Sequence, residues 1–202
     1  MRTTDMAVTM SEDRALAEAF GLTEGRGRIA KQVALVALGV VFLAVMSKIR
    51  VPFWPVPLTM QTFGTLLVGA AFGFRLGGLT LLAWLAVGAA GVSVFNGDAA
   101  GLAYFAGPTG GYLVGFAVAG ALVGWLAERG WSRSVRGMVG ALLLGNIVIY
   151  AFGVPWMAYL FLAERGADWV IQYSFTNFLL GDAVKLALAA VMLPAAWKLS
   201  GR

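Results

Sequence analysis

Asp182 and Lys185 are the residues of this chain whose types and spacing best suit a ligand-binding or reactive site. They lie three residues apart in an otherwise uncharged stretch, 178–185. The chain has no Cys and no His, which excludes a thiolate nucleophile, an imidazole base, a disulfide and a Cys/His zinc site. Carboxylates, lysines, tyrosines and hydroxyls are the reactive groups that remain.

On a helix, Asp182 and Lys185 would share a face and could neutralise one another. Each ionised group costs about 2.5–3.5 kcal/mol at the centre of a membrane-spanning helix, and such residues usually mark a substrate pathway. A carboxylate accepts N–H bonds and an ammonium donates to oxygen. The pair therefore predicts a site for a small ligand with a urea or amide group. A metal site is not expected because this segment offers one carboxylate, and the alternative is an ion pair that only staples the helices together.

The segment 51–62 combines three prolines with Phe53 and Trp54 and leads into Gln61. Prolines cannot continue a helix, so we expect a stiff loop here. As a functional element, this loop would cover a ligand that enters from outside. As a structural one, it would anchor Trp54 at the membrane interface.

A second irregular segment, 91–112, is rich in glycine. Pro108 followed by small residues is typical of a helix start, where free N–H groups can face a polar ligand. A simple turn would explain the glycines equally well. Asn96 and Tyr112 bring hydrogen-bonding groups to the same outer rim as the proline-rich loop, so we select both as site candidates.

Membrane-spanning helices must position these residues. Of the 202 residues, 60% are apolar and 12% are charged, and the mean hydropathy is +0.82, whereas a soluble domain carries about a quarter charged residues. Several uncharged stretches reach the roughly 20 residues that a spanning helix needs. We predict an all-α membrane protein, a bundle of six transmembrane helices with a short polar N-terminal tail. The predicted spans are 30–47, 58–74, 76–95, 110–127, 137–162 and 172–197.

Charge placement predicts the orientation of this bundle. The 15 basic residues outnumber the 10 acidic ones, but their sorting relative to the spans indicates a lipid bilayer and not a nucleic acid as the partner. Six spans put both termini on one side, which the positive-inside rule makes cytoplasmic. The basic residues on that side are Arg2, Arg14, Arg26, Arg28, Lys31, Arg75, Arg129, Arg133, Arg136, Lys198 and Arg202.

Residues 1–28 are predicted to be a cytoplasmic tail, and residues 29–202 a single substrate-binding domain of six helices. Within the tail, Ser11–Arg14 is typical of the cap of a short surface helix that continues into Ala15. Small residues four apart predict close helix packing inside the bundle. The glycine pairs with this spacing are Gly69 and Gly73, Gly73 and Gly77, Gly111 and Gly115, and Gly120 and Gly124.

Four blocks of the sequence resemble the BioY family, the substrate-binding (S) components of biotin transporters of the energy-coupling factor (ECF) type. The blocks are Pro55–Thr62, Gly73–Gly77 with Arg75, Gly107–Phe116 and Gly181–Lys185. The resemblance implies a six-helix protein of the cytoplasmic membrane that captures biotin from outside, without a cofactor and without enzymatic activity.

The resemblance also implies roles for individual residues. The family's Asp and Lys on the last helix correspond to Asp182 and Lys185, which would hydrogen-bond the polar ends of biotin in either order. The polar loop residue of the family corresponds to Asn96, although Ser93 stands here where proline is usual. We expect the gating loops to close over the ligand. The remaining residues expected around biotin are Phe53, Trp54, Gln61, Phe95, Tyr112 and Tyr173.

Partner proteins are implied as well. The sequence contains no Gly-x-x-x-x-Gly-Lys-Ser/Thr loop, so it is not itself a P-loop ATPase. The resemblance implies a transmembrane coupling (T) subunit and cytoplasmic ATPase subunits. Ala30 and Ala34, at the cytoplasmic end of the first span, match the small-residue pair that meets the coupling subunit in related S components.

Three alternatives remain open from the residues alone. The chain could bind another small vitamin, which the sequence does not distinguish from biotin. It could be an intramembrane enzyme with Asp182 as base and Lys185 as activator, although one carboxylate without His or Cys makes this unfavourable. It could also be a purely structural subunit whose polar residues hold the helices together.

Overall fold

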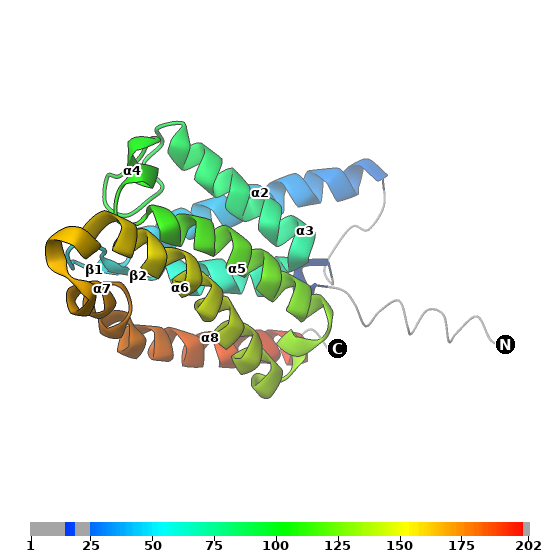
Figure 1. Ribbon diagram of the computed structural model, residues 1–202. Helices are drawn as coiled ribbons and strands as arrows, with labels where there is room; N and C mark the ends of the chain where they lie inside the picture. Colours follow the sequence, from blue (N-terminus) through cyan, green and yellow to red (C-terminus); the bar gives the residue numbers. More distant parts are fainter. Residues whose placement is uncertain (1–14, 19–24, 200–202) are drawn as a thin grey trace.

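The computed structural model describes residues 15–18 and 25–199, and most of this chain is helical (Figure 1). Five segments of the described residues are long and apolar enough to cross a membrane. The short antiparallel ladder β1–β2 is the one departure from the all-α prediction within the described residues. In chain order the elements are η1 (Leu16–Glu18), α2 (Gly25–Lys48), β1 (Arg50–Val51), β2 (Leu58–Thr59), α3 (Gln61–Ala89), α4 (Ala103–Ala106), α5 (Gly110–Glu128), η2 (Trp131–Arg133), α6 (Val135–Arg165), α7 (Ala167–Ser174), η3 (Thr176–Phe178) and α8 (Leu179–Leu199).

Helix α3 reverses direction at Gly73, where the backbone adopts φ +80° and ψ −178°. A Cβ atom placed on Gly77 would lie 3.1 Å from the Cα atom of Gly69, whereas a straight helix separates residues eight apart by about 12 Å. Therefore α3 consists of two legs, 61–72 and 74–89, that fold back on each other (Figure 1). Glycine suits the turn because it reaches positive φ without a steric cost.

The boundaries of the predicted spans differ from the structure after this turn. The chain reverses between the spans predicted at 58–74 and 76–95, as expected, but the second leg ends at Ala89. The segment that follows is irregular because Gly91, Gly97 and Gly101 all have positive φ. It lies over the start of α5 at one end of the bundle (Figure 1).

The prediction of one helix over 172–197 is wrong. The backbone of Phe175 leaves the helical region, with φ −139° and ψ −63°, so α7 ends and α8 begins afresh after η3. Thr176 and Asn177 favour such a break because their side chains compete for backbone hydrogen bonds. As a result, Asp182 lies in the first turn of α8 and not near the middle of a span.

Helices α3 and α5 pack at the centre of the bundle through glycines. A Cβ atom on Gly69 would lie 2.9 Å from the carbonyl carbon of Gly120, and one on Gly124 would lie 2.5 Å from that of Gly73. The backbones can approach this closely only where both helices carry small residues. The predicted close packing is therefore confirmed at this contact.

Helix α2 lies along α3 and presents most of its apolar surface outward. Only 11% of its most apolar window is buried within the protein, and its first turns extend away from the other helices (Figure 1). Val33, Leu38 and Val41 are each more than 60% exposed. Such a surface needs a lipid environment or a membrane partner.

The bundle has two chemically different ends (Figure 1). The end that holds β1, β2, α4 and α7 is called the pocket end below. The opposite end, called the basic end, holds the turn in α3, the end of α5, η2 and the end of α8. The elements of the basic end, together with the start of α2, carry most of the described basic residues, namely Arg28, Lys31, Arg75, Arg129, Arg133, Arg136 and Lys198.

Only part of the predicted N-terminal tail can be placed. The cap predicted at Ser11–Arg14 lies outside the described residues. The turn η1 follows it, and Ala15 is buried against the reversal of α3, 2.9 Å from where a Cβ atom on Gly73 would stand. Helix α2 begins at Gly25, a few residues before the predicted span.

Candidate ligand-binding site

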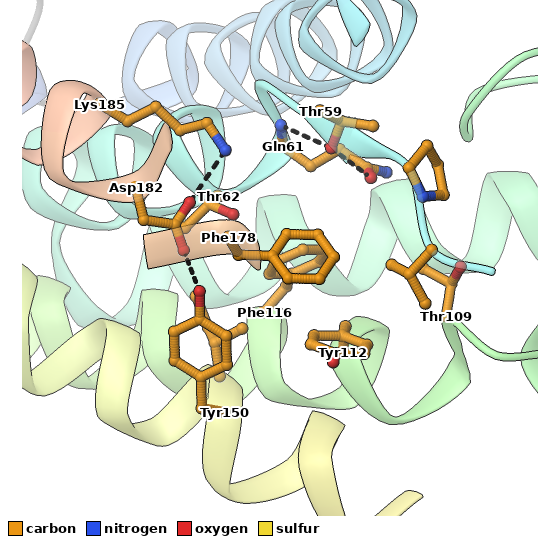
Figure 2. A pocket seen from close by; sticks show the side chains of 13 residues that line it. Thr59, Gln61, Thr62, Thr109, Tyr112, Phe116, Tyr150, Phe178, Asp182 and Lys185 are labelled. Carbon is orange, nitrogen blue, oxygen red and sulfur yellow. Dashed lines mark hydrogen bonds and ion pairs between the residues drawn. The ribbon is translucent and has the colours of Figure 1, made fainter. Parts of the chain in front are cut away.

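A pocket at the pocket end is formed by residues of α3, α5, α6 and α8 together with the loop before α3 (Figure 2). Its cavity volume is about 30 Å³, well below the roughly 300–1,000 Å³ of small-molecule sites, so the lining residues must move apart before a ligand can enter. Its wall combines aromatic rings with hydroxyl, amide and charged groups. The lining residues are Val56, Pro57, Thr59, Gln61, Thr62, Thr109, Tyr112, Phe116, Ile149, Tyr150, Phe178, Asp182 and Lys185.

Asp182 and Lys185 form an ion pair in this wall, with 2.9 Å between Lys185 Nζ and Asp182 Oδ1. Their side chains are 11% and 12% exposed, respectively. Tyr150 of α6 donates its hydroxyl to the other carboxylate oxygen, Oδ2 (Figure 2). The two charges cancel within the wall. The unused lone pairs of Asp182 and N–H groups of Lys185 remain for a neutral ligand that both donates and accepts.

Gln61, at the start of α3, supplies an unpaired amide donor to the same pocket. The Thr59 hydroxyl donates to Gln61 Oε1 over 2.9 Å, and the backbone N–H of Gln61 donates to that hydroxyl over 3.2 Å. Gln61 is 3% exposed, and its Nε2 has no hydrogen-bond partner. A buried donor without a partner costs free energy, so this amide is suited to an acceptor on a ligand.

The rings of Tyr112, Phe116 and Phe178 form the apolar middle of the pocket (Figure 2). Tyr112 is fixed because its hydroxyl donates to the carbonyl of Ser174 over 2.6 Å. Its ring centroid lies 6.3 Å from that of Phe178. These rings separate the Asp182–Lys185 pair from Thr109 on the other side of the pocket (Figure 2).

Two cations, Lys48 at the end of α2 and Arg50 in β1, tie the region before α3 to the glycine-rich segment after α3. Lys48 donates to the carbonyl of Gly97 and, over 3.1 Å, to the hydroxyl of Ser93. Arg50 Nη1 donates to Asn96 Oδ1 over 3.0 Å. Asn96, a predicted site residue, is therefore held at the rim and does not line the pocket.

Aromatic rings of the predicted gating loop join it to α7. Phe53 stacks on Tyr173 with a centroid distance of 5.7 Å, and Trp54 lies 5.7 Å from Trp169. The guanidinium of Arg165 lies 5.6 Å from the Trp54 ring, within range of a cation–π contact. Tyr173 thus belongs to this outer aromatic cluster and not to the pocket lining.

Phe95 occupies a different place from the other predicted ring residues. It is fully buried beneath the glycine-rich segment, 5.2 Å from the Trp84 ring and 5.1 Å from the Tyr104 ring between centroids. Gly88 lies against its ring, where no Cβ atom would fit. The structure therefore places Phe95 in the core that supports the segment.

Sequence reasoning placed Asp182, Lys185, Gln61 and Tyr112 in one pocket, and the structure brings all four together. It missed several lining residues, above all Tyr150, which bonds directly to Asp182. The available signal was the pair of polar residues in the otherwise apolar fifth span, since Asn146 and Tyr150 lie four apart. The other lining residues that it missed are Val56, Pro57, Thr59, Thr62, Thr109, Phe116, Ile149 and Phe178.

The fold and the pocket define a polytopic helical membrane protein with a charged site at one end of the bundle. The chain belongs to the BioY family, whose model matches residues 11–202. It is 37% identical over 163 residues to a protein of Pyrococcus horikoshii described as "Probable biotin transporter BioY", an alignment that covers 81% of this chain and 94% of that protein.

Other relatives agree with this assignment. The chain is 34% identical over 166 residues to "Biotin transporter BioY" of Rhizobium etli, which covers 79% of this chain and 87% of that protein. The crystal structure of an S-component for biotin from an ECF-type ABC transporter has the same fold, with a TM-score of 0.74 and 24% sequence identity. The match covers 87% of this chain and 95% of that one. The prediction of a membrane transport protein is confirmed, and the enzyme alternative is set aside.

Proposed function

We propose that this protein captures biotin at the outer face of the cytoplasmic membrane, as the S component of an ECF-type transporter. The observation that carries the proposal is the neutral, buried group formed by Asp182, Lys185 and Tyr150. The ureido ring of biotin offers two N–H donors beside a carbonyl acceptor, which match a carboxylate next to an ammonium. The apolar rings between that group and Thr109 would hold the fused ring system.

Six membrane spans follow if each leg of α3 is counted separately. The start of α2 and the end of α8 then lie at the basic end, and the positive-inside rule places that end in the cytoplasm. Residues 1–28 are assigned to a cytoplasmic tail and 29–202 to the substrate-binding domain. In this orientation the pocket opens outward, where the vitamin is captured.

Partner subunits would supply the energy for uptake. We assign Ala30 and Ala34 of α2 to the contact with a transmembrane coupling subunit, which would in turn join cytoplasmic ATPase subunits. Both alanines are exposed, and small residues four apart allow a second helix to approach closely. The outward apolar surface of α2 supports the same assignment.

Selective binding tests the proposed substrate. The purified protein in detergent is expected to bind biotin at least 100-fold more tightly than thiamine or riboflavin, which corresponds to about 2.7 kcal/mol. The reason is that neither alternative presents a carbonyl flanked by two N–H donors to the Asp182–Lys185 pair. Isothermal titration with the three vitamins measures the ratio, and equal affinity for all three would exclude biotin as the specific ligand.

The outer aromatic cluster predicts a kinetic effect. Trp54→Ala removes contacts with Trp169 and Arg165 that hold the loop against α7, so the loop should open more often. We expect biotin to dissociate about fivefold faster, with a smaller change in the association rate, because most interface substitutions act on dissociation. Stopped-flow displacement measures both rates. Trp131→Ala, at the basic end, is the matched control. If both variants release biotin at the same rate, the loop that carries Trp54 is not a gating loop.

A further inference from the structure

The charge balance of the pocket restricts where an acidic group can bind. Asp182 and Lys185 neutralise each other at 2.9 Å, so a ligand carboxylate placed beside them would compete with Asp182 for Lys185 and would be repelled by Asp182. A net negative charge in a buried site is costly without a further cation. Biotin, the proposed ligand on which this inference rests, carries a carboxylate in addition to its ureido ring.

Arg50 supplies a cation on the same side of the ladder as the pocket. Its partner in the β1–β2 register is Thr59, and directly opposed residues in an antiparallel ladder project their side chains to one face. Thr59 lines the pocket. Arg50 forms no ion pair with any acid among the described residues, and its hydrogen bond to Asn96 uses only one of five N–H donors.

Tyr104 connects Arg50 to the pocket. Its hydroxyl is buried and makes no hydrogen bond of ordinary geometry, although the side chains of Thr109 and Asn96 lie close enough to interact with it and the charge of Arg50 acts on it. Burial raises the pKa of this hydroxyl above its ordinary value, so it stays protonated as a donor. Thr109 lines the pocket on the side opposite the Asp182–Lys185 pair (Figure 2).

We propose that Arg50 and the hydroxyl of Tyr104 bind the carboxylate of the ligand, and that its ureido ring lies at Asp182 and Lys185. This arrangement gives each charged group one opposite partner: Lys185 keeps Asp182, and Arg50 gains the carboxylate. It also gives the buried hydroxyl of Tyr104 a charged acceptor. The ligand would therefore lie across the pocket, with its acidic end toward the outer loops.

A comparison of biotin with biotin amide tests this orientation, because the amide keeps the ring system and removes the charge. For Arg50→Gln, the affinity for biotin is expected to fall at least tenfold, while the affinity for the amide changes less than twofold. Tyr104→Phe should weaken biotin about threefold and the amide less, because the amide oxygen accepts a weaker hydrogen bond than the carboxylate. Arg50→Lys, which keeps the charge, should recover part of the biotin affinity.

Lys48→Gln is the matched control, since Lys48 is a neighbouring cation that contacts only Ser93 and Gly97 in the described loops. It should affect both ligands equally. If Arg50→Gln weakens biotin and its amide to the same extent, Arg50 only holds the loop through Asn96 and the inference is overturned. If the unmodified protein binds neither compound, the proposed function itself fails and the inference falls with it.

Discussion

Replacing Lys185 with Met is expected to lower the free energy of unfolding by about 3 kcal/mol, because it leaves the buried carboxylate of Asp182 without its cation. Of the residues that the structure describes, the Tyr150 hydroxyl would still donate to that carboxylate. The same variant should lose at least tenfold in biotin affinity. Denaturant titration in mixed micelles measures the first quantity, and isothermal titration measures the second.

The double variant Asp182→Asn, Lys185→Met separates stability from binding. Both charges are gone, and the Asn amide oxygen can still accept from Tyr150, so stability should return to within about 1 kcal/mol of the unmodified protein. Biotin binding should not return. Lys198→Met, near the exposed end of the same helix, controls for loss of a lysine in general. A double variant that binds biotin normally would show that the pair is only a structural staple.

The second large effect is expected at the contact between α3 and α5. Gly69→Ala places a methyl group 2.9 Å from the carbonyl carbon of Gly120 and 3.0 Å from its Cα atom, and backbone cannot rotate away as a side chain can. The helices must separate, and we expect a loss of about 1–3 kcal/mol in stability. Thermal unfolding in detergent measures the effect as a lower midpoint.

Gly78→Ala is the matched control on the same helix. Its nearest neighbour would be the Ala121 Cβ atom at 3.9 Å, which is ordinary van der Waals contact, so the variant should unfold at about the same temperature as the unmodified protein. Equal destabilisation by both substitutions would mean that helix propensity, and not the close approach of Gly69 to Gly120, decides the outcome.

The ion pair of the site could be predicted from sequence because charge is scarce in this chain. Burying an ionised side chain in an apolar segment costs free energy unless it faces a polar cavity or an opposite charge. Asp182 and Lys185 therefore indicate a polar cavity by their presence in such a segment. The signal for Tyr150 is weaker, because an uncharged tyrosine four residues after Asn146 in an apolar span has many tolerable environments, and its role depends on which residue the fold brings opposite. The hydrogen bond from Tyr150 to Asp182 depends on the tertiary fold and cannot be read from the spacing of residues along the chain.

The predicted helix bounds are most accurate where a long apolar segment defines the helix. They are least accurate where the backbone leaves the helical conformation inside such a segment. The region of α6 was predicted within a few residues because it is long and uncharged. The break at Phe175 was missed because the stretch 169–181 carries no charged residue, so no charge marks the end of a helix there. Phe95 was expected near the ligand because of its loop position, whereas burial against Trp84 places it in the core.

The reversal of α3 at Gly73 also determines how deeply the site lies in the bilayer. The leg 61–72 rises about 18 Å at 1.5 Å per residue, whereas the hydrocarbon layer is about 30 Å thick. A leg of this length that starts at the basic end stops well inside that layer. The membrane around α3 must therefore thin locally, or the protein's own loops must replace the missing lipid depth. In either case we expect the pocket to lie below the level of the lipid headgroups.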